Sequence, residues 1–371
     1  MEQTRMVYVL GSTTAVYPSP AAAWAIDGPA DAAAGYEAFR SSATYTPRPG
    51  LNDRGLSGLN LSGSSQMRPS GLPKLLAVLA PLPSPLGHGR RDTVPDASIA
   101  SELASGRRPV FVIDARQESH LLLCGADRAM AWREGHNQGN AGRSPAEVLE
   151  DERQRLYQLL ARPSGSTLVV HQVADPGHLL TLSLDGVCTE AQLVQAAGAH
   201  PLRMPMSDEV PTPPVSLLDA LVACWRFLPD DAWVHIHCEH GHGRTTVQMV
   251  LYDCWRNASQ VSLADIIVRQ HLLGGVDLTT HAHAACLPRL HSFYAYAVAV
   301  LAAVPGTPEL YSLWRHRHAA LADGDEVRPA AVPAPAAQTR AGRPRAGAAP
   351  RTSELTRTPS TVWGYPTGPC R

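Results

Sequence analysis

Lysine is almost absent from this sequence of 371 residues: Lys74 is the only one, so arginine supplies 31 of the 32 basic side chains. Basic and acidic residues nearly balance, with a formal net charge of −1, which argues against a nucleic-acid-binding protein. No run approaches the ~20 apolar residues that cross a bilayer, so we expect no transmembrane segment. Arginine keeps its charge and binds phosphate or carboxylate through two N–H groups at once, so the shortage of lysine matters for how this protein binds anions.

A Cys-x-x-Cys pair and a Sec signal peptide are also missing. The seven cysteines are widely spaced and odd in number, which favours buried thiols or one reactive thiol over a disulfide framework. The same pattern makes a reducing compartment the default. Residues 1–21 lack the basic start and the continuous apolar run of a signal peptide.

Composition divides the chain into three parts. Residues 1–50 are rich in Ala, Ser, Thr and Pro and show no period, so we expect them to be disordered. The segment 326–371 is similar but basic, and we expect it to be disordered too. From Val327 onward seven arginines face Glu354 alone, a net charge of +6 that leaves −7 on residues 1–326. We therefore predict one folded, acidic domain over residues 51–325.

Strand and helix patterns alternate within that domain. Short apolar runs suit buried strands at 109–114, 167–172 and 232–237. Ser144 followed by Pro145 and Glu147 is typical of a helix start, and this helix continues through Leu160. Other helical patterns cover 217–225, 244–255 and a segment that starts at Ser262. The alternation predicts an α/β fold with a mostly parallel central sheet flanked by helices.

The segment from Val234 to Thr246 carries the chemistry. An apolar strand leads to Cys238, a loop with two glycines follows, and a helix begins near Arg244. Backbone N–H groups in such a loop converge on an anion, and the helix dipole favours both a phosphate and a thiolate. The guanidinium of Arg244 can grip two phosphate oxygens at once. The pattern predicts a phosphate-binding loop with a reactive cysteine.

This loop resembles the Cys-x5-Arg signature of protein-tyrosine-phosphatase (PTP) type enzymes, and its form His-Cys-Glu-x-Gly-x-Gly-Arg-Thr-Thr is similar to the PTP-like phytases. Further segments strengthen the resemblance, namely 59–66, 114–120 (Asp-Ala-Arg-Gln-Glu-Ser-His), 140–144, 269–271 and 274–275. The resemblance covers residues 55–318. It implies a PTP-like fold with a small β-rich subdomain, and hydrolysis of myo-inositol polyphosphates, phytate first, without a cofactor or metal.

The resemblance also implies roles for individual residues. Cys238 would be the nucleophile, Arg244 the phosphate ligand, and Thr245 the hydroxyl that stabilises the departing thiolate. Asp208, in the segment 206–213, matches the family's general-acid loop upstream of the cysteine. His237 would orient Cys238 through hydrogen bonds. Phosphate contacts are expected from Glu239, His240, Gly241, His242, Gly243, Arg244 and Arg116.

Two loop positions depart from the family. His240 stands where a small alanine is usual, and His242 occupies a variable position that is basic in related lipid phosphatases. We expect His242 to bind or sense a neighbouring phosphate and to confer an acidic pH preference. Members of the family use lysines around the substrate, and here arginines would have to replace them; the arginines considered are Arg116, Arg143, Arg269 and Arg289.

Several alternatives stay open. A protein tyrosine or dual-specificity phosphatase would use the same loop, and bulky histidines in the loop would also fit a catalytically weak inositol-phosphate-binding module. The histidines around Cys238 suggest a metal site, but Arg244 would sit beside the cation, so we expect none. Arg116 is as well placed to pair with Glu118 as to bind substrate. The irregular cluster of His281, His283, Cys286 and His291 is typical of a surface loop.

Expectations for location and partners come from the resemblance. Relatives of this family include secreted enzymes and effectors that plant pathogens inject into host cells. The alternatives here are injection or residence in the cytoplasm, with residues 1–50 as a hypothetical type III export signal. We expect a polyphosphorylated inositol as the partner and no nucleic acid, with the basic tail a solvated segment. The oligomeric state is not predicted.

Overall fold

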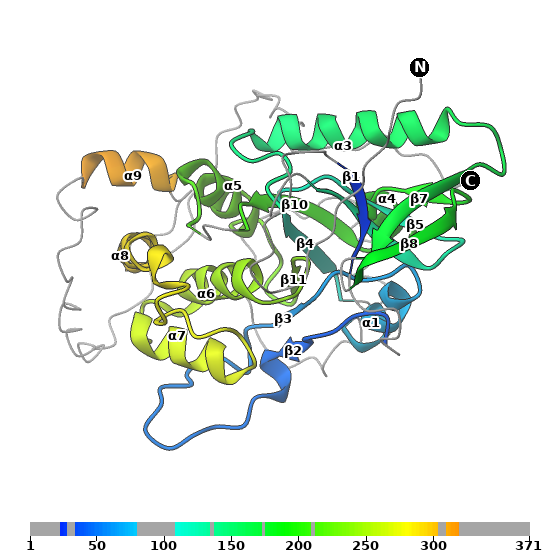
Figure 1. Cartoon of the computed structure of the whole chain (residues 1–371). Helices are drawn as coiled ribbons and strands as arrows, with labels where there is room; N and C mark the ends of the chain where they lie inside the picture. The colour runs from blue at the N-terminus through cyan, green and yellow to red at the C-terminus, as the bar shows by residue number, and fades with distance from the viewer. Residues whose placement is uncertain are drawn as a thin grey trace, which may run out of the picture.

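A computed structural model describes residues 23–27, 34–79, 108–133, 137–172, 175–208, 212–302 and 309–318. Its centre is a five-stranded sheet in the order β10-β4-β11-β3-β2 (Figure 1). These strands are β10 (His200–Met206), β4 (Val110–Arg116), β11 (Trp233–His237), β3 (Leu61–Ser64) and β2 (Arg40–Ser41). The first four run parallel, and β2 runs antiparallel to β3. The predicted α/β class with a mostly parallel central sheet is confirmed.

A second sheet has six strands in the order β8-β7-β1-β6-β5-β9. They are β8 (Asp175–Ser183), β7 (Thr167–Gln172), β1 (Ala23–Ile26), β6 (Arg128–Arg133), β5 (His120–Leu123) and β9 (Val187–Cys188). Every pairing is antiparallel except that of β1 with β7. This is the expected β-rich subdomain, although it has more strands than the central sheet. Leu156 and Leu159 of α3 (Pro145–Leu160) belong to the same buried cluster as Trp24 and Leu168 of this sheet.

Helices cover both faces of the central sheet. Phe111 and Ile113 of β4 join the largest buried cluster, while Val110 and Val112 join another, because successive strand residues face opposite sides. The larger cluster contains α5 (Val215–Trp225), α6 (Gly243–Asn257), α7 (Leu263–Leu272), α8 (Leu287–Ala302) and α9 (Tyr311–Arg317). The other contains α1 (Gly71–Leu79) and α4 (Glu190–Ala196). The 3-10 turns are η1 (Ser42–Thr44) and η2 (Ala284–Cys286).

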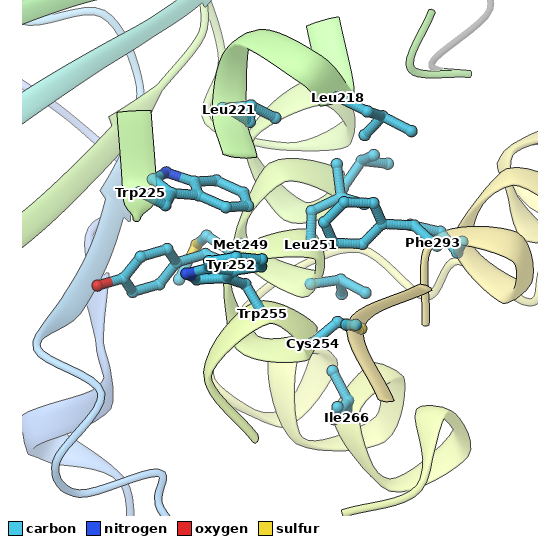
Figure 2. Close-up of a cluster of buried hydrophobic side chains, with 14 of the residues drawn as sticks. Leu218, Leu221, Trp225, Met249, Leu251, Tyr252, Cys254, Trp255, Ile266 and Phe293 are labelled. Atoms are coloured by element: carbon cyan, nitrogen blue, oxygen red, sulfur yellow. The ribbon is translucent and has the colours of Figure 1, made fainter. Parts of the chain in front are cut away.

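The central helix α6 positions the phosphate-binding loop. Most of its residues are buried, so neighbouring elements hold it on nearly every side. In Figure 2, Trp225 of α5 lies beside Tyr252 of α6, with Leu251 and Phe293 nearby. The Trp225 and Tyr252 rings meet edge to face, with centroids 5.2 Å apart. The helix start that follows the loop is therefore anchored in the largest core of the protein.

Local sequence signals place several of these elements correctly. Helix α3 begins with the expected capping box, in which the Ser144 N–H donates to Glu147 Oε2 at 2.7 Å and Ser144 Oγ accepts from the Glu147 N–H. Strand β7 has the predicted bounds, and β4, β11 and α6 agree within two residues. Within the described residues, no helix is both long and apolar enough to cross a membrane.

The predicted boundary at residue 50 is wrong. Strand β1 lies between β6 and β7, and β2 completes the central sheet, so residues 23–27 and 34–50 contain parts of both sheets. The Ala- and Ser-rich composition hid these strands because their partners lie far away in sequence: Ala25 pairs with Ala131, and Arg40 with Gly63. The expected disorder of residues 1–22 and 326–371 falls outside the described residues.

Candidate active site

The candidate site lies at the carboxyl ends of the parallel strands. Cys238 directly follows β11, the central strand, and the loop after it ends where α6 begins at Gly243 (Figure 1). Asp208 comes two residues after β10, and Ser64 is the last residue of β3, the strand next to β11. Because parallel strands present their carboxyl ends at one edge, residues distant in sequence meet there.

Gly241 gives the loop its shape. Its φ is +74°, and a Cβ at this position would lie 2.5 Å from the carbonyl carbon of Ser64 and 2.6 Å from the amide nitrogen of Ser65. Both the left-handed conformation and the close approach of β3 therefore require glycine. The Gln66 N–H donates to the Glu239 carbonyl at 2.9 Å, which ties the other side of the loop to the segment after β3.

Arg244 is oriented by two hydrogen bonds to Glu118 and forms an ion pair with Asp208. Its Nη1 donates to Glu118 Oε2 at 2.7 Å and its Nη2 donates to Glu118 Oε1 at 3.2 Å, while Nε lies 2.9 Å from Asp208 Oδ1. Burial lowers the pKa of Arg244, but the charges of Glu118, Asp208 and Cys238 outweigh burial and raise it. Burial raises the pKa of Glu118, yet Arg244 and Arg116 hold it well below its usual range. The guanidinium is thus charged and pre-oriented.

Asp208, the predicted general acid, lies beside this guanidinium. Its Oδ2 accepts a hydrogen bond from Asn137 Nδ2 at 2.8 Å, and its side chain is 35% exposed. Asn137 also donates to Glu239 Oε2 at 3.0 Å and to Glu118 Oε1 at 3.3 Å. A partly exposed carboxyl at the mouth of the loop can exchange protons with a leaving group and with water.

Cys238 and Thr245, predicted as the nucleophile and as the hydroxyl that stabilises its thiolate, are both buried. Cys238 is 3% exposed, and Thr245 in the first turn of α6 is buried. Thr245 Oγ1 has no hydrogen-bond partner in the described part of the chain. A buried hydroxyl without a partner is rare in proteins and is commonly found where function uses it.

Four predicted contacts need correction. Arg116 is fully buried, with Nη1 2.6 Å from Asp27 Oδ2 and Nε 2.7 Å from Glu118 Oε1, so its alternative role as an ion-pair partner holds. The Glu239 side chain is buried against Arg133, which leaves only the Glu239 backbone to face a phosphate. Arg269 is buried on Asp253 and is no substitute for a surface lysine. The hydrogen bond expected between His237 and Cys238 is absent from the described part of the chain, where His237 Nε2 lies 2.6 Å from Glu190 Oε1 and Nδ1 has no hydrogen-bond partner.

The exposed loop histidines border a cavity of about 310 Å³. His240 and His242 line it together with Tyr36, Glu37 and Arg68. The pKa of His242 is lowered, first by burial and then by the charges of His240, Arg40 and His283, with Glu37 opposing. His283 lies near the loop, with its Cε1 3.9 Å from the position that a Cβ on Gly243 would take. The prediction of a surface loop for the cluster at 281–291 is only partly right: His281 and His291 are exposed, but Cys286 is buried and His291 lies on helix α8.

Sequence reasoning missed Arg40. This arginine begins β2, is 3% exposed, and donates from Nη1 to the Gly241 carbonyl at 2.6 Å and from Nη2 to Thr246 Oγ1 at 3.1 Å. The composition around it gives no signal, since the segment was expected to be disordered. Asn137 was missed as well, whereas Glu118 belongs to the segment that resembles the family and only its role was not assigned.

One buried group has the geometry of a cation site. Asp114, His120 and Glu190 bring three ligand atoms within 4.8 Å of one another. Arg203 already supplies positive charge there, because its Nη1 forms an ion pair with Asp114 and lies 3.0 Å from His120 Nδ1. The arrangement is therefore that of a buried ion-pair network.

Comparisons with known proteins agree with this site. A model of the PTP-like phytase family, described as "Inositol hexakisphosphate", matches residues 113–255, which include Cys238 and Arg244. The chain is 30% identical over 179 residues to "Effector protein hopD2" of Pseudomonas syringae pv. tomato, covering 46% of this chain and 36% of that protein.

Two solved structures from Mitsuokella multacida have similar folds. The tandemly repeated PTP-like phytase is 26% identical with a TM-score of 0.63, over 85% of this chain and 50% of that one. The PTP-like myo-inositol phosphatase in complex with myo-inositol-(1,3,4,5)-tetrakisphosphate has the same identity and TM-score, over 81% and 50%. The chain thus spans about half the length of these structures and 36% of the Pseudomonas protein. The matched family model, the loop and the two solved structures thus make this chain similar to the PTP-like phytases in fold and in the region around Cys238.

Proposed function

We propose that this protein is a cysteine-dependent phosphomonoesterase that hydrolyses myo-inositol polyphosphates, with phytate as the first substrate to test. The observation that carries the proposal is the orientation of Arg244 in the loop after Cys238. Glu118 holds the guanidinium through two hydrogen bonds, and Asp208 forms an ion pair with it. A planar guanidinium held in this way matches the equatorial oxygens of a transferring phosphoryl group.

The proposed reaction has two steps. In the first, the Cys238 thiolate attacks phosphorus in line, the bond from phosphorus to the ester oxygen breaks, and Asp208 gives its proton to the leaving alcohol. In the second step, Asp208 takes a proton from water as the water oxygen attacks phosphorus. Cys238 leaves as a thiolate, and the free hydroxyl of Thr245 stabilises it.

Substrate recognition would rest on the loop and its histidines. Backbone amides of the segment 239–243 and the Arg244 fork would hold the reacting phosphate. His240 and His242 border the adjoining cavity, where a second phosphate of a polyphosphorylated ring would meet them. The pKa of His242 is lowered, so its ring becomes positively charged only at a pH below the usual pKa of histidine. This supports an acidic pH preference for the reaction.

The decisive assay is phosphate release from phytate. We expect release by the wild type, loss of at least about 10³-fold with Cys238→Ser, and a smaller loss of about 10²-fold with Asp208→Asn. A parallel assay with a phosphotyrosyl peptide separates the inositol phosphatase from a protein phosphatase. Tight phytate binding without turnover would instead establish a binding module. For His242→Ala, a pH–rate profile that superimposes on the wild type would remove His242 from the proposal.

Export is a separate part of the proposal. The similarity to a protein named as an effector supports delivery into a host cell. Since residues 23–27 and 34–50 contribute strands to the fold, we place the hypothetical export signal within residues 1–22. A reporter fused to residues 1–22 that stays inside a secretion-competent cell would argue against this placement.

A further inference from the structure

Two cysteines outside the phosphate-binding loop lie side by side at the edge of the six-stranded sheet. The Sγ atoms of Cys124 and Cys188 are 3.7 Å apart, and both residues are present as thiols. Cys124 directly follows β5, and Cys188 is the last residue of the edge strand β9. The two positions are 64 residues apart in sequence, so it is the fold that brings these sulfurs together.

The strand pairing fixes the backbone around both cysteines. Leu122 of β5 lies directly opposite Cys188, and the Cys124 N–H continues the pairing by donating to the Gly186 carbonyl at 3.1 Å. Side chains alternate between the two faces of a sheet, so Cys124 shares the face of Leu122. In agreement, Cys124 packs against the buried cluster that contains Leu122 and Cys188. The two cysteines are therefore diagonal neighbours on one face of the sheet.

Solvent reaches the two sulfurs unequally. Cys124 is partly exposed, whereas Cys188 is 1% exposed. The residue opposite Cys124 is Gly186, where φ is +69° and a Cβ would lie 3.1 Å from the Cβ of Cys124. A larger residue at 186 would crowd Cys124, and glycine leaves it open. A small reagent in solvent therefore reaches Cys124 before it reaches Cys188.

The separation of the sulfurs suits the formation of a disulfide bond. The sulfur atoms of a disulfide are about 2.05 Å apart, so each Sγ has to move by only about 0.8 Å from its present place. A rotation of about 30° around the Cα–Cβ bond moves Sγ by this amount. The bond can therefore form through side-chain rotation while the strand pairing stays in place.

We propose that Cys124 and Cys188 are an oxidisable pair that forms a disulfide when the protein meets hydrogen peroxide. In the first step, the Cys124 sulfur attacks one peroxide oxygen, the oxygen–oxygen bond breaks, and water leaves, so that Cys124 becomes a sulfenic acid. In the second step, the Cys188 sulfur attacks the Cys124 sulfur, and the sulfenic hydroxyl leaves as water with the proton of Cys188. Two thiols are oxidised to one disulfide, and one peroxide is reduced to two waters.

The disulfide would fasten the passage between the two sheets. Strand β9 is two residues long and pairs with β5, and the chain then enters α4, which packs on the central sheet through Val194. The bond would close a loop that contains β6, α3, β7 and β8, and it would therefore restrict the unfolded chain more than the folded one. We expect the midpoint of thermal unfolding to rise by at least about 3 °C.

The test is peptide mapping of the whole chain after treatment with hydrogen peroxide. The remaining thiols are blocked with iodoacetamide, and the tryptic peptides are analysed by mass spectrometry without reduction. Arg128 and Arg155 lie between the two cysteines, so trypsin releases Cys124 and Cys188 on separate peptides unless a disulfide joins them. We expect the joined peptide to become the main form of both, and to disappear after reduction with dithiothreitol. The rise in the thermal midpoint should disappear with it.

Two variants sharpen the test. Cys188→Ser removes the thiol that completes the disulfide, so Cys124 should stop at the sulfenic acid, which dimedone traps, and the thermal midpoint should not rise. Cys224→Ser is the matched control, because Cys224 is also a partly exposed thiol, and it should form the joined peptide as the wild type does. Circular dichroism shows whether each variant is folded.

Three results would count against the inference. A wild type in which both thiols survive the peroxide, or in which Cys124 is oxidised while Cys188 stays a thiol, would overturn it. A disulfide from Cys124 to a different cysteine would do the same. A joined peptide with an unchanged thermal midpoint would overturn the stabilising role of the bond. If Cys188→Ser does not fold, Cys124→Ser decides, because it also removes the joined peptide. None of these measurements uses a phosphate ester, so their outcome is independent of the proposed function.

Discussion

Arg40 offers a sharp test of how the site is assembled, because it comes from a segment that composition assigns to a disordered end. Its Nη1 holds the Gly241 carbonyl and its Nη2 holds Thr246 Oγ1 in the first helical turn. In a trans peptide the carbonyl and the following N–H point in opposite directions, so this contact directs the His242 N–H away from Arg40. Arg40→Met keeps the apolar stem and removes the guanidinium.

The magnitude follows from two opposing effects. Hydrogen bonds from a charged donor are worth about 1.5–3 kcal/mol each, so the two bonds contribute about 3–6 kcal/mol. Against this, burial lowers the pKa of Arg40 to about 10 from 12.5, partly offset by the charge of Cys238, a cost of about 3 kcal/mol. We expect Arg40→Met to lower the free energy of unfolding by about 2 kcal/mol, since the Gly241 carbonyl also loses its donor.

Activity should fall more than stability. Loss of one oriented donor at an oxyanion typically costs about 10²–10³ in rate, and we expect kcat/KM for phytate to fall about 10²-fold. The assay is phosphate release, with urea unfolding of the same samples as the stability measurement. Arg48→Met is the matched control, because Arg48 is exposed in the same segment. A folded Arg40→Met with kcat/KM within about threefold of Arg48→Met would refute the reasoning.

Three further predictions concern the loop and its ion pairs. Gly241→Ala should lose most activity and about 1–2 kcal/mol of unfolding free energy by urea titration, because φ is +74° and the methyl would meet Ser64. Glu118→Gln, which loosens the Arg244 fork, should lower kcat at least about tenfold in steady-state kinetics, and an unchanged kcat would contradict that role. Both Asp27 and Glu118 have lowered pKa values in the folded state, so their stabilisation is complete only above about pH 5 and is lost as the pH falls further. Acid titration should therefore unfold the wild type more steeply below that pH than Asp27→Asn.

Much of the fold follows from local patterns that the sequence displays openly. The capping box at Ser144 fixes the start of α3, and β-branched runs mark β4 and β7 within two residues. Strands β1 and β2 were not predictable in this way. Each is short, and the ladder partners that stabilise it, β6 and β3, lie far along the chain.

The same division applies to the site. The glycines and arginine around Cys238 predict a phosphate-binding loop because their spacing alone allows the chain to wrap an anion. The sequence did not decide whether Arg116 binds a phosphate or a carboxylate, since a guanidinium fits both equally well. Its burial between Asp27 and Glu118 decided the question. The sequence could not predict the role of Arg40, because its partners Gly241 and Thr246 are remote in the chain.

The shortage of lysine shows which part of the charge distribution the sequence sets and which part the fold sets. Sequence alone determined that positive charge around the proposed substrate must come from arginine or histidine, because Lys74 is the only lysine. Only the tertiary structure decided which ones: Arg116 and Arg269 neutralise buried carboxylates, Arg244 and Arg40 shape the loop, and His240 and His242 face the cavity. The physical reason is that burial pairs a guanidinium with the nearest carboxylate, and which carboxylate is nearest depends on the packed fold.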